Sequence, residues 1–371
     1  MNQVKQSQKA IYLHKAFGFS TPIPGFESAI HINEKASPFV PAINPDYVFE
    51  PGMVARVMRS YAARENIMIT GEKGTGKSSF VQQFCARLNI PLMVINGGPG
   101  LDETYLMGSK TIENGSVKAV DGVLSYCLRH GIPVMIDEIA AIKPSVLVSI
   151  NDVLNGDQVI TLKHHGLDPN TAPDDLATQE GSMTIHRNPR FRLFATDNTG
   201  GKMSRDPRYS GVNTQNSAVR SRFTSFKMCF MHPALELKAL VGATKGALPT
   251  VVAKLMIELA MRVRASFEQG EMTDTVSFRE LQRWARKSLV YAVPNLLDLD
   301  GDGKPKIKPD CATAFVDAIF TGMEESDQAV ASEMYELVFN MKLELPKEYT
   351  ETAGSFLTLL DSGAIDWDIA A

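Results

Sequence analysis

The sequence predicts an α/β protein in which helices cover both faces of a parallel sheet, followed by a small all-helical domain. Short apolar runs of strand length alternate with helically patterned segments as far as about residue 232. Such alternation is typical of a parallel sheet whose strands are buried on both faces. Beyond about residue 233 the remaining patterns are amphipathic helices. The expected strands lie at residues 67–70, 91–97, 131–138 and 191–198.

The 371 residues suffice for two or three domains. The first 40 residues are polar, contain several prolines and show no sustained period, so we expect an N-terminal arm there. Two later stretches rich in Asp, Gly and Pro interrupt the regular pattern and predict surface loops. We therefore expect an arm over residues 1–40, an α/β domain over 41–232 with insertions at about 101–120 and 159–186, a helical domain over 233–345 with a loop at 298–309, and a tail over 346–371.

Composition excludes several classes of protein. Lys and Arg total 38 against 42 Asp and Glu, a net charge of −4, so no global positive field favours nucleic acid or anionic lipid. The N-terminus lacks the features of a secretory signal, and no stretch reaches about 18 uncharged apolar residues. The four cysteines have no zinc-site spacing. We therefore expect a cytoplasmic protein with reduced thiols and no membrane contact.

The loop after the first strand reads GEKGTGKS, which matches the phosphate-binding pattern G-x-x-x-x-G-K-[ST] between a strand and a helix. The backbone N–H groups of such a loop wrap phosphates, and its lysine neutralises the β- and γ-phosphates. The Ser78 hydroxyl is a ligand for Mg²⁺. A glycine turn without a ligand is the alternative. The predicted binding residues are Gly71, Glu72, Lys73, Gly74, Thr75, Gly76, Lys77, Ser78 and Ser79.

Polar side chains follow two later strands of the predicted sheet. Asp137 and Glu138 end the run at 131–138, and Asn198 ends the run at 191–198. The carboxyl edge of a parallel sheet is where such proteins bind their ligands. We expect Asp137 to hold Mg²⁺, directly or through water, and Glu138 to polarise an attacking water. Asn198 would orient that water or contact the γ-phosphate.

The segment NSAVRSRF at 216–223 presents two arginines, Arg220 and Arg222. A guanidinium offered across a subunit interface can stabilise charge that develops on a neighbour's γ-phosphate. The residues alone leave open which of the two arginines does so.

The order of these motifs, followed by a helical domain, resembles that of the AAA+ ATPases. Within them the sequence is most similar to the MoxR-like branch and, in that branch, to the AAA+ subunits of aerobic cobaltochelatases. The matching text includes INPDYVFEP at 43–51, VKAVDGVLSYCLRHGIPVMIDE at 117–138, NPRFRLFATDNTGG at 188–201, NSAVRSRF at 216–223 and VSFRELQRWA at 276–285.

This resemblance implies ATP and Mg²⁺ as cofactors and a homo-oligomer in the form of a hexameric ring. It implies a motor that remodels or activates a protein client. Partners of this kind include a protein with a von Willebrand A domain and a chelatase subunit, and the work done can be metal insertion into a tetrapyrrole. By position, the resemblance implies that Lys77 and Ser78 are Walker A, Asp137 and Glu138 Walker B, Asn198 sensor 1, Arg222 the finger and Arg279 sensor 2.

The two insertions also resemble features of this branch. Residues 101–120 resemble a hairpin that projects toward the central pore, and VITL and MTIH within 159–186 are expected to pair around a long loop. Basic residues in these insertions either line a pore and hold an acidic partner or are simply solvated. They are Lys110, Lys118, Lys163, His164 and His165.

Two other functions stay open from the sequence. A nucleic-acid translocase is the main alternative, although the net charge and the lack of a long basic run argue against it. A nucleotide-bound scaffold without turnover is the second. The string DLDGDG at 298–303 resembles the start of a calcium loop, but position 12 is Pro309 instead of Glu, so we expect a plain acidic turn.

Overall fold

The computed structural model describes residues 8–35, 37–113, 116–164, 172, 184–198, 217–291, 297–299, 305–308, 310–346, 349 and 362. The chain divides into two compact units, Met1–Met231 and His232–Ala371, and each is described by itself. Within the described residues, no helix is both long enough and apolar enough to cross a bilayer.

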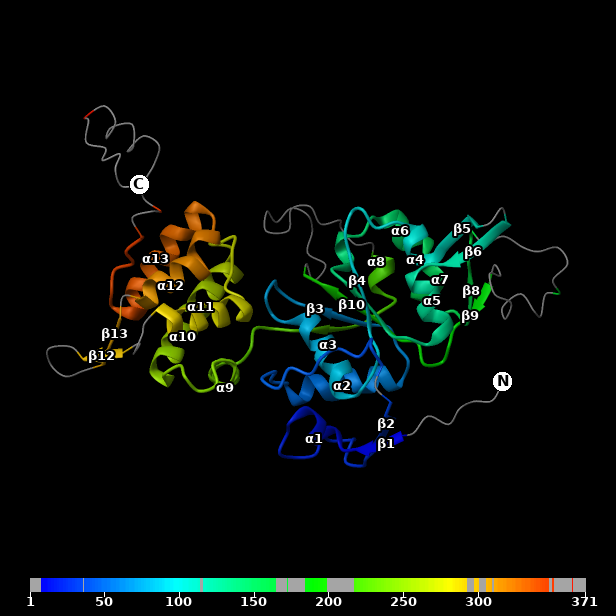
Figure 1. Ribbon diagram of the computed structural model, residues 1–371, viewed down its shortest axis with the longest axis horizontal. Helices are drawn as coiled ribbons and strands as arrows, with labels where there is room; N and C mark the ends of the chain where they lie inside the picture. Colours follow the sequence, from blue (N-terminus) through cyan, green and yellow to red (C-terminus); the bar gives the residue numbers. More distant parts are fainter. Residues whose placement is uncertain are drawn as a thin grey trace. The chain divides into compact units, whose positions relative to one another are not determined.

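The first unit is built on a parallel sheet of five strands in the order β11-β3-β10-β7-β4 (Figure 1). The predicted α/β class is therefore confirmed, and all the expected strands are present. The edge strand β11 was not predicted. The bounds are β3 Ile67–Thr70, β4 Met93–Asn96, β7 Val134–Asp137, β10 Leu193–Asp197 and β11 Thr224–Lys227.

Helices cover both faces of this sheet, because successive strand residues point to opposite sides. Ile67 and Ile69 pack in one core with α2 (Pro51–Ala62) and α3 (Lys77–Arg87). Met68, between them, packs into a second core on the opposite face. The helices of that face are α5 (Val123–His130), α6 (Pro144–Ser149) and α7 (Asn151–Asn155).

The described part of the N-terminal segment packs on the α2 and α3 side. It contains α1 (Leu13–Phe17) and two paired strands, β1 (Gln8–Ile11) and β2 (Ile30–Asn33). Leu13 and Phe17 are buried in the same core as α3. The sequence did not predict these elements because β1 is mostly exposed and carries no apolar alternation.

Both insertions contain a hairpin, as expected. After α4 (Glu103–Met107), β5 (Gly108–Glu113) pairs antiparallel with β6 (Ser116–Asp121). In the second insertion β8 (Val159–Thr161) pairs antiparallel with β9 (Thr184–His186). Of the basic residues singled out in the insertions, His165 lies outside the described residues.

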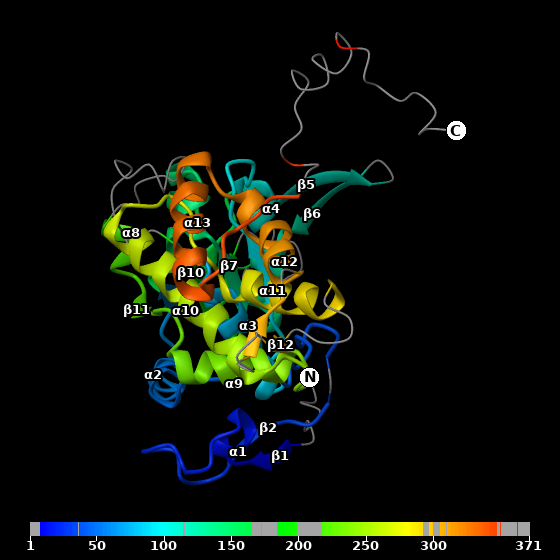
Figure 2. The same cartoon turned by 90° about the vertical axis from the view of Figure 1, so that its left-hand side faces the viewer.

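The second unit is mainly helical. Helix α10 packs against α9 and α13, and α11 packs along α12 (Figure 2). The expectation that strands end near residue 233 is wrong in one place, because β12 (Leu297–Leu299) pairs with β13 (Pro305–Ile307). Most of the calcium-like string lies outside the described residues. The helices are α9 Pro233–Ala243, α10 Thr250–Gln269, α11 Phe278–Tyr291, α12 Asp310–Ala318 and α13 Glu325–Phe339.

Candidate functional site

The glycine-rich loop connects β3 to α3. Residues 71–76 form the loop, and Lys77, Ser78 and Ser79 form the first turn of α3. No side chain caps the start of this helix, so its positive dipole end stays open to an anion. A Cβ on Gly71 would lie 2.2 Å from the Met228 carbonyl oxygen, at a φ of +155°. Glycine thus allows the end of β3 to pass close to the chain that follows β11.

Lys77 is the buried cation of the loop, with 5% of its surface exposed. Its Nζ donates to the carbonyl oxygens of Gly71 at 3.0 Å and Glu72 at 2.8 Å. Burial lowers the pKa of Lys77 to about 8, against the opposing effect of nearby carboxylates, of which Asp197 acts most strongly. The amino group is therefore held at the loop in surroundings that stabilise its charge only weakly.

Asp137 lies at the end of β7 and meets two hydroxyl groups. Ser78 Oγ donates to Asp137 Oδ1 at 2.5 Å, and Thr196 Oγ1 donates to the same oxygen at 2.5 Å. The structure therefore brings together the two residues predicted to hold Mg²⁺, which are 59 positions apart in the chain.

Glu138 follows directly in a left-handed backbone conformation, with φ +55°. This region is unfavourable for a residue with a Cβ, and such strain clusters at functional sites. The Glu138 N–H donates to Thr196 Oγ1 at 2.9 Å, which helps to hold the turn. A Cβ on Gly97 would lie 2.3 Å from the Glu138 carbonyl oxygen, so the close approach of β4 to this turn also requires glycine.

Asn198 lies beside Glu138, as expected from the strand ends. Its Nδ2 donates to Glu138 Oε1 at 3.0 Å. This contact orients the carboxylate from the neighbouring strand β10 and uses only one of its two oxygens.

A hydroxyl and a carboxylate together fit Mg²⁺, which proteins commonly hold through one or two carboxylates, waters and substrate phosphates. Ser78 and Asp137 supply such oxygens within one hydrogen-bond length of each other. In the part of the chain that the structure describes, no group of three or more His, Cys, Asp or Glu side chains could enclose a metal ion. A magnesium ion held by these two residues would take its remaining ligands from phosphate and water.

The two candidate finger arginines lie at the end of the short helix α8 (Ser217–Arg220) and just after it. Arg222 Nε donates to Asn155 Oδ1 at 2.6 Å. Thr224 pairs with Ile67 at the start of β3, whereas the glycine loop follows the other end of β3. Arg222 therefore lies at the opposite edge of the sheet from the glycine loop.

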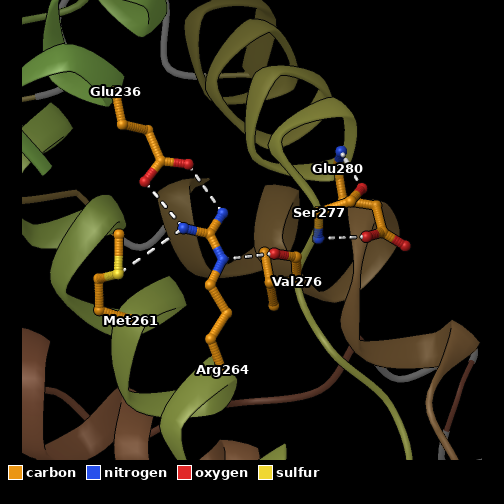
Figure 3. A network of polar contacts seen from close by, with 6 residues as sticks. All are labelled: Glu236, Met261, Arg264, Val276, Ser277 and Glu280. Atoms are coloured by element: carbon orange, nitrogen blue, oxygen red, sulfur yellow. Dashed lines mark hydrogen bonds and ion pairs between the residues drawn. The ribbon is translucent and has the colours of Figure 1, made fainter. Parts of the chain in front are cut away.

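Arg279 lies in the second unit, near the start of α11. Ser277 and Glu280 form a reciprocal cap there, with Ser277 N to Glu280 Oε2 at 2.7 Å and Glu280 N to Ser277 Oγ at 3.2 Å. The buried Arg264 donates from Nε to the Val276 carbonyl oxygen at 2.8 Å (Figure 3). The start of α11 is thus fixed within its own unit.

An ion pair also holds the Arg264 side chain in place. Arg264 donates from its two terminal nitrogens to the two Glu236 carboxylate oxygens, at 2.8 Å and 2.7 Å. Both side chains are almost fully buried, with 3% and 1% exposed. Because Glu236 belongs to α9 and Arg264 to α10, the pair joins these two helices, and the bond to Val276 adds the segment that leads into α11 (Figure 3).

The basic residues of the insertions do not gather on one surface. Lys110 faces Ala119 across the first hairpin, whereas Lys118 faces Thr111, so the two lysines project from opposite faces. Lys163 Nζ and His164 Nε2 each lie 3.8 Å from Glu103 Oε1. Lys110 and Lys118 therefore do not share one face of the first hairpin.

Sequence reasoning missed Thr196 and Gly97, which shape the turn at Asp137 and Glu138. Thr196 lies in a strand that is buried throughout, where a hydroxyl needs a partner. That mismatch is visible in the run LFATD. Gly97 directly follows the strand MVIN, and glycine in or beside a strand often marks a close approach of two backbones.

Comparison with known proteins agrees with this geometry. A family profile described as "AAA domain (dynein-related subfamily)" matches residues 66–223, which include the glycine loop, the acidic strand end and Arg222. The chain is 26% identical over 342 residues to "Aerobic cobaltochelatase subunit CobS" of Sinorhizobium sp, covering 90% of this chain and 91% of that protein.

Two shorter matches point the same way. "Protein CbbQ" of Hydrogenophilus thermoluteolus is 22% identical over 57% of this chain and 70% of its own length. "Protein NorQ" of Paracoccus denitrificans is 23% identical over 64% of this chain and 80% of its own length. Residues 66–223 are thus similar to the AAA domain of the dynein-related subfamily, and the chain is similar to CobS, CbbQ and NorQ.

Proposed function

We propose that this protein hydrolyses ATP as a subunit of a hexameric ring and uses the released energy to remodel a protein client. The observation that carries the proposal is the convergence of Ser78, Asp137, Glu138 and Asn198 at one edge of the sheet. These residues come from three separate elements, so a shared ligand explains their meeting better than local chain geometry does.

Each residue has a separate part in the proposed reaction. Lys77 and the start of α3 bind the phosphates, and Ser78 and Asp137 would hold Mg²⁺, which neutralises developing charge when bound. Glu138 Oε2 accepts a hydrogen bond from the attacking water, while Asn198 fixes the other carboxylate oxygen. Thr196 keeps the backbone turn in place.

The finger is proposed to act on the neighbouring subunit. Arg222 lies at the edge of the sheet opposite its own glycine loop, and the four residues of β3 separate the two edges by roughly 13 Å at about 3.3 Å per residue. Its guanidinium therefore does not reach the phosphates of its own subunit. A ring places this edge against the next nucleotide, where an arginine stabilises the transition state.

The client is proposed from the relatives. A relative that covers 90% of this chain is named as a subunit of aerobic cobaltochelatase. A protein with a von Willebrand A domain and a chelatase subunit are accordingly the proposed partners, and metal insertion into a tetrapyrrole is the proposed outcome. Arg279 would sense the nucleotide from the second unit.

Two variants test the ATPase assignment. Lys77→Ala should lose ATP binding because the cation at the phosphates is gone, whereas Glu138→Gln should bind ATP with unchanged affinity and hydrolyse it at least about 100-fold more slowly. Equilibrium binding and steady-state turnover of both variants are the measurements. Undiminished turnover of Glu138→Gln would contradict the catalytic role. Stimulation of turnover by DNA that disappears at high salt would favour the translocase instead.

A further inference from the structure

We propose that Asn155 and Asn66 are positioning residues that hold Arg222 in the orientation needed at a neighbouring subunit's nucleotide. The inference rests on the proposed function, because it takes Arg222 as the finger. It concerns a cluster at the amino edge of the sheet, opposite the glycine loop, in which Asn155 and Asn66 belong to none of the predicted nucleotide motifs.

The side chain of Arg222 is held through one nitrogen. Its Nε donates to Asn155 Oδ1 at 2.6 Å, a short hydrogen bond that fixes the plane of the guanidinium. The bond leaves both terminal nitrogens out of the contact. A guanidinium held this way presents the end of its fork, which is the part that binds phosphate oxygens in two-point contacts.

The backbone of Arg222 is held as well. Its carbonyl oxygen accepts from Asn66 Nδ2 at 3.2 Å, and the same nitrogen donates to the Leu154 carbonyl oxygen at 2.7 Å. Asn66 is 7% exposed and directly precedes β3. One buried amide therefore links the strand before the glycine loop, the end of α7 and the finger residue.

Arg187 completes the cluster from the second insertion. Its Nη2 donates to Asn66 Oδ1 at 3.2 Å, and its Nη1 donates to the Val153 carbonyl oxygen at 3.0 Å. Arg187 directly follows β9, and its guanidinium carbon lies 4.9 Å from the centre of the Phe191 ring. The β8–β9 hairpin is thus fastened to the same amide that holds Arg222.

The neighbouring arginine is not held in this way. Arg220 Nε is buried and has no hydrogen-bond partner among the residues that the structure describes. Arg222 Nε has a side-chain acceptor whereas Arg220 Nε has none among the described residues, which favours Arg222 as the arginine whose side-chain orientation the fold controls.

Asn155→Ala tests the proposal because it removes the acceptor for Arg222 Nε without touching the nucleotide motifs. We expect ATP binding to be unchanged and turnover to fall about 10- to 100-fold, the usual effect of a misplaced reacting group. Asn155→Asp keeps an acceptor oxygen at the same position and should recover most of the turnover. Asn151→Ala, on the same helix and outside the cluster, is the matched control and should behave like the unaltered protein.

Subunit mixing then separates positioning from loss of structure. Asn155→Ala subunits keep a working Glu138, and Glu138→Gln subunits keep a working finger, so the mixture should turn over ATP faster than either parent does alone. Asn155→Ala mixed with Arg222→Ala should not, because both lack a working finger. The reference mixture is Arg222→Ala with Glu138→Gln.

The possible results are distinct. If the reference mixture recovers turnover and the Asn155→Ala mixture with Glu138→Gln does not, Asn155 acts within its own subunit and the inference is overturned. If the reference mixture itself fails in assembled rings, the finger does not act between subunits, and the proposed function and the inference fall together. Failure of Asn155→Asp to restore turnover would also count against the positioning role.

Discussion

At the scale of the single residue, the charge of Lys77 is the property on which phosphate binding depends. Its pKa of about 8 in the free protein means that the amino group loses its proton above that pH. Bound phosphates favour the charged form, so ATP binding should take up a proton in this range. We expect the Kd for ATP to rise as the pH increases through 8, by up to about tenfold per pH unit.

Calorimetry in two buffers of different ionisation enthalpy measures this uptake directly. Uptake linked to Lys77 should be near zero at pH 7 and approach one proton per site near pH 9. The stability of the fold changes with pH in the opposite direction to the affinity for ATP. Above pH 8 the Lys77 amino group binds more protons in the unfolded chain than in the folded one. Its contribution to the free energy of unfolding therefore rises with pH in this range. A Kd that stays flat between pH 7 and pH 9 would contradict the burial effect on Lys77.

Thr196 gives a second prediction at this scale. Thr196→Val keeps the shape of the side chain but removes the hydroxyl that joins Asp137 Oδ1 to the Glu138 N–H. Because a hydrogen-bond partner orients a metal ligand, we expect the Mg²⁺ concentration for half-maximal turnover to rise, or turnover itself to fall, by about 10- to 100-fold. Magnesium titrations of the ATPase rate are the measurement. Thr196→Ser, which keeps the hydroxyl, should remain close to the unaltered protein.

The nucleotide motifs were predictable because they are local. Lys77 and Ser78 lie within eight residues of the end of β3. Asp137 ends β7 and Glu138 follows it. Asn66 and Arg222 meet across 156 positions of chain, and neither stands in a pattern that indicates the other. Such contacts depend on which strands become neighbours, so no spacing within the sequence reveals them.

At the scale of the element, the buried ion pair of Arg264 and Glu236 decides how firmly the start of α11 is held. Arg264→Met leaves the Glu236 carboxylate buried without its partner, and we expect the free energy of unfolding of the second unit to fall by about 3–5 kcal/mol. Replacing both residues by apolar ones should cost less than this single change. Urea unfolding followed by Trp284 fluorescence, with Trp367→Phe as background, is the measurement.

The same helix α10 supplies the control. Arg262 pairs with Glu258 at 2.7 Å, but the two side chains are 43% and 49% exposed. Removing this pair with Arg262→Met should change the free energy of unfolding by about 0.5 kcal/mol or less, because water screens it. If both substitutions lowered the free energy of unfolding equally, burial would not explain the contribution of the Arg264 pair to stability.

The strands illustrate what a sequence can indicate about elements. β3 and β10 are buried along almost their whole length and therefore appear as continuous apolar runs. β11 reads TSFK and alternates between half-buried and exposed residues, because it is an edge strand. β11 contains no apolar run from which a strand could be predicted, and its pairing with β3 depends on the tertiary structure.

At the scale of the whole molecule, the finger should make activity depend on assembly. If Arg222 works only on a neighbour's nucleotide, turnover per subunit should fall as the protein is diluted below the concentration at which rings form. Light scattering and ATPase rates over the same dilution series are the measurements. Full turnover by particles of 40.7 kDa, the mass of one chain, would contradict the ring.

The pairing of the edge strand β11 with β3 fixes how many residues the chain needs between the finger and the end of this strand. Its residues pair one for one with β3, and the Met228 N–H that follows donates to the Thr70 carbonyl oxygen at 2.7 Å. One extra residue within the strand would turn every later side chain to the other face and displace Met228 from Gly71. The exposed Ser225 and Lys227 can therefore change identity freely, whereas the number of residues from Arg222 to Met228 cannot change.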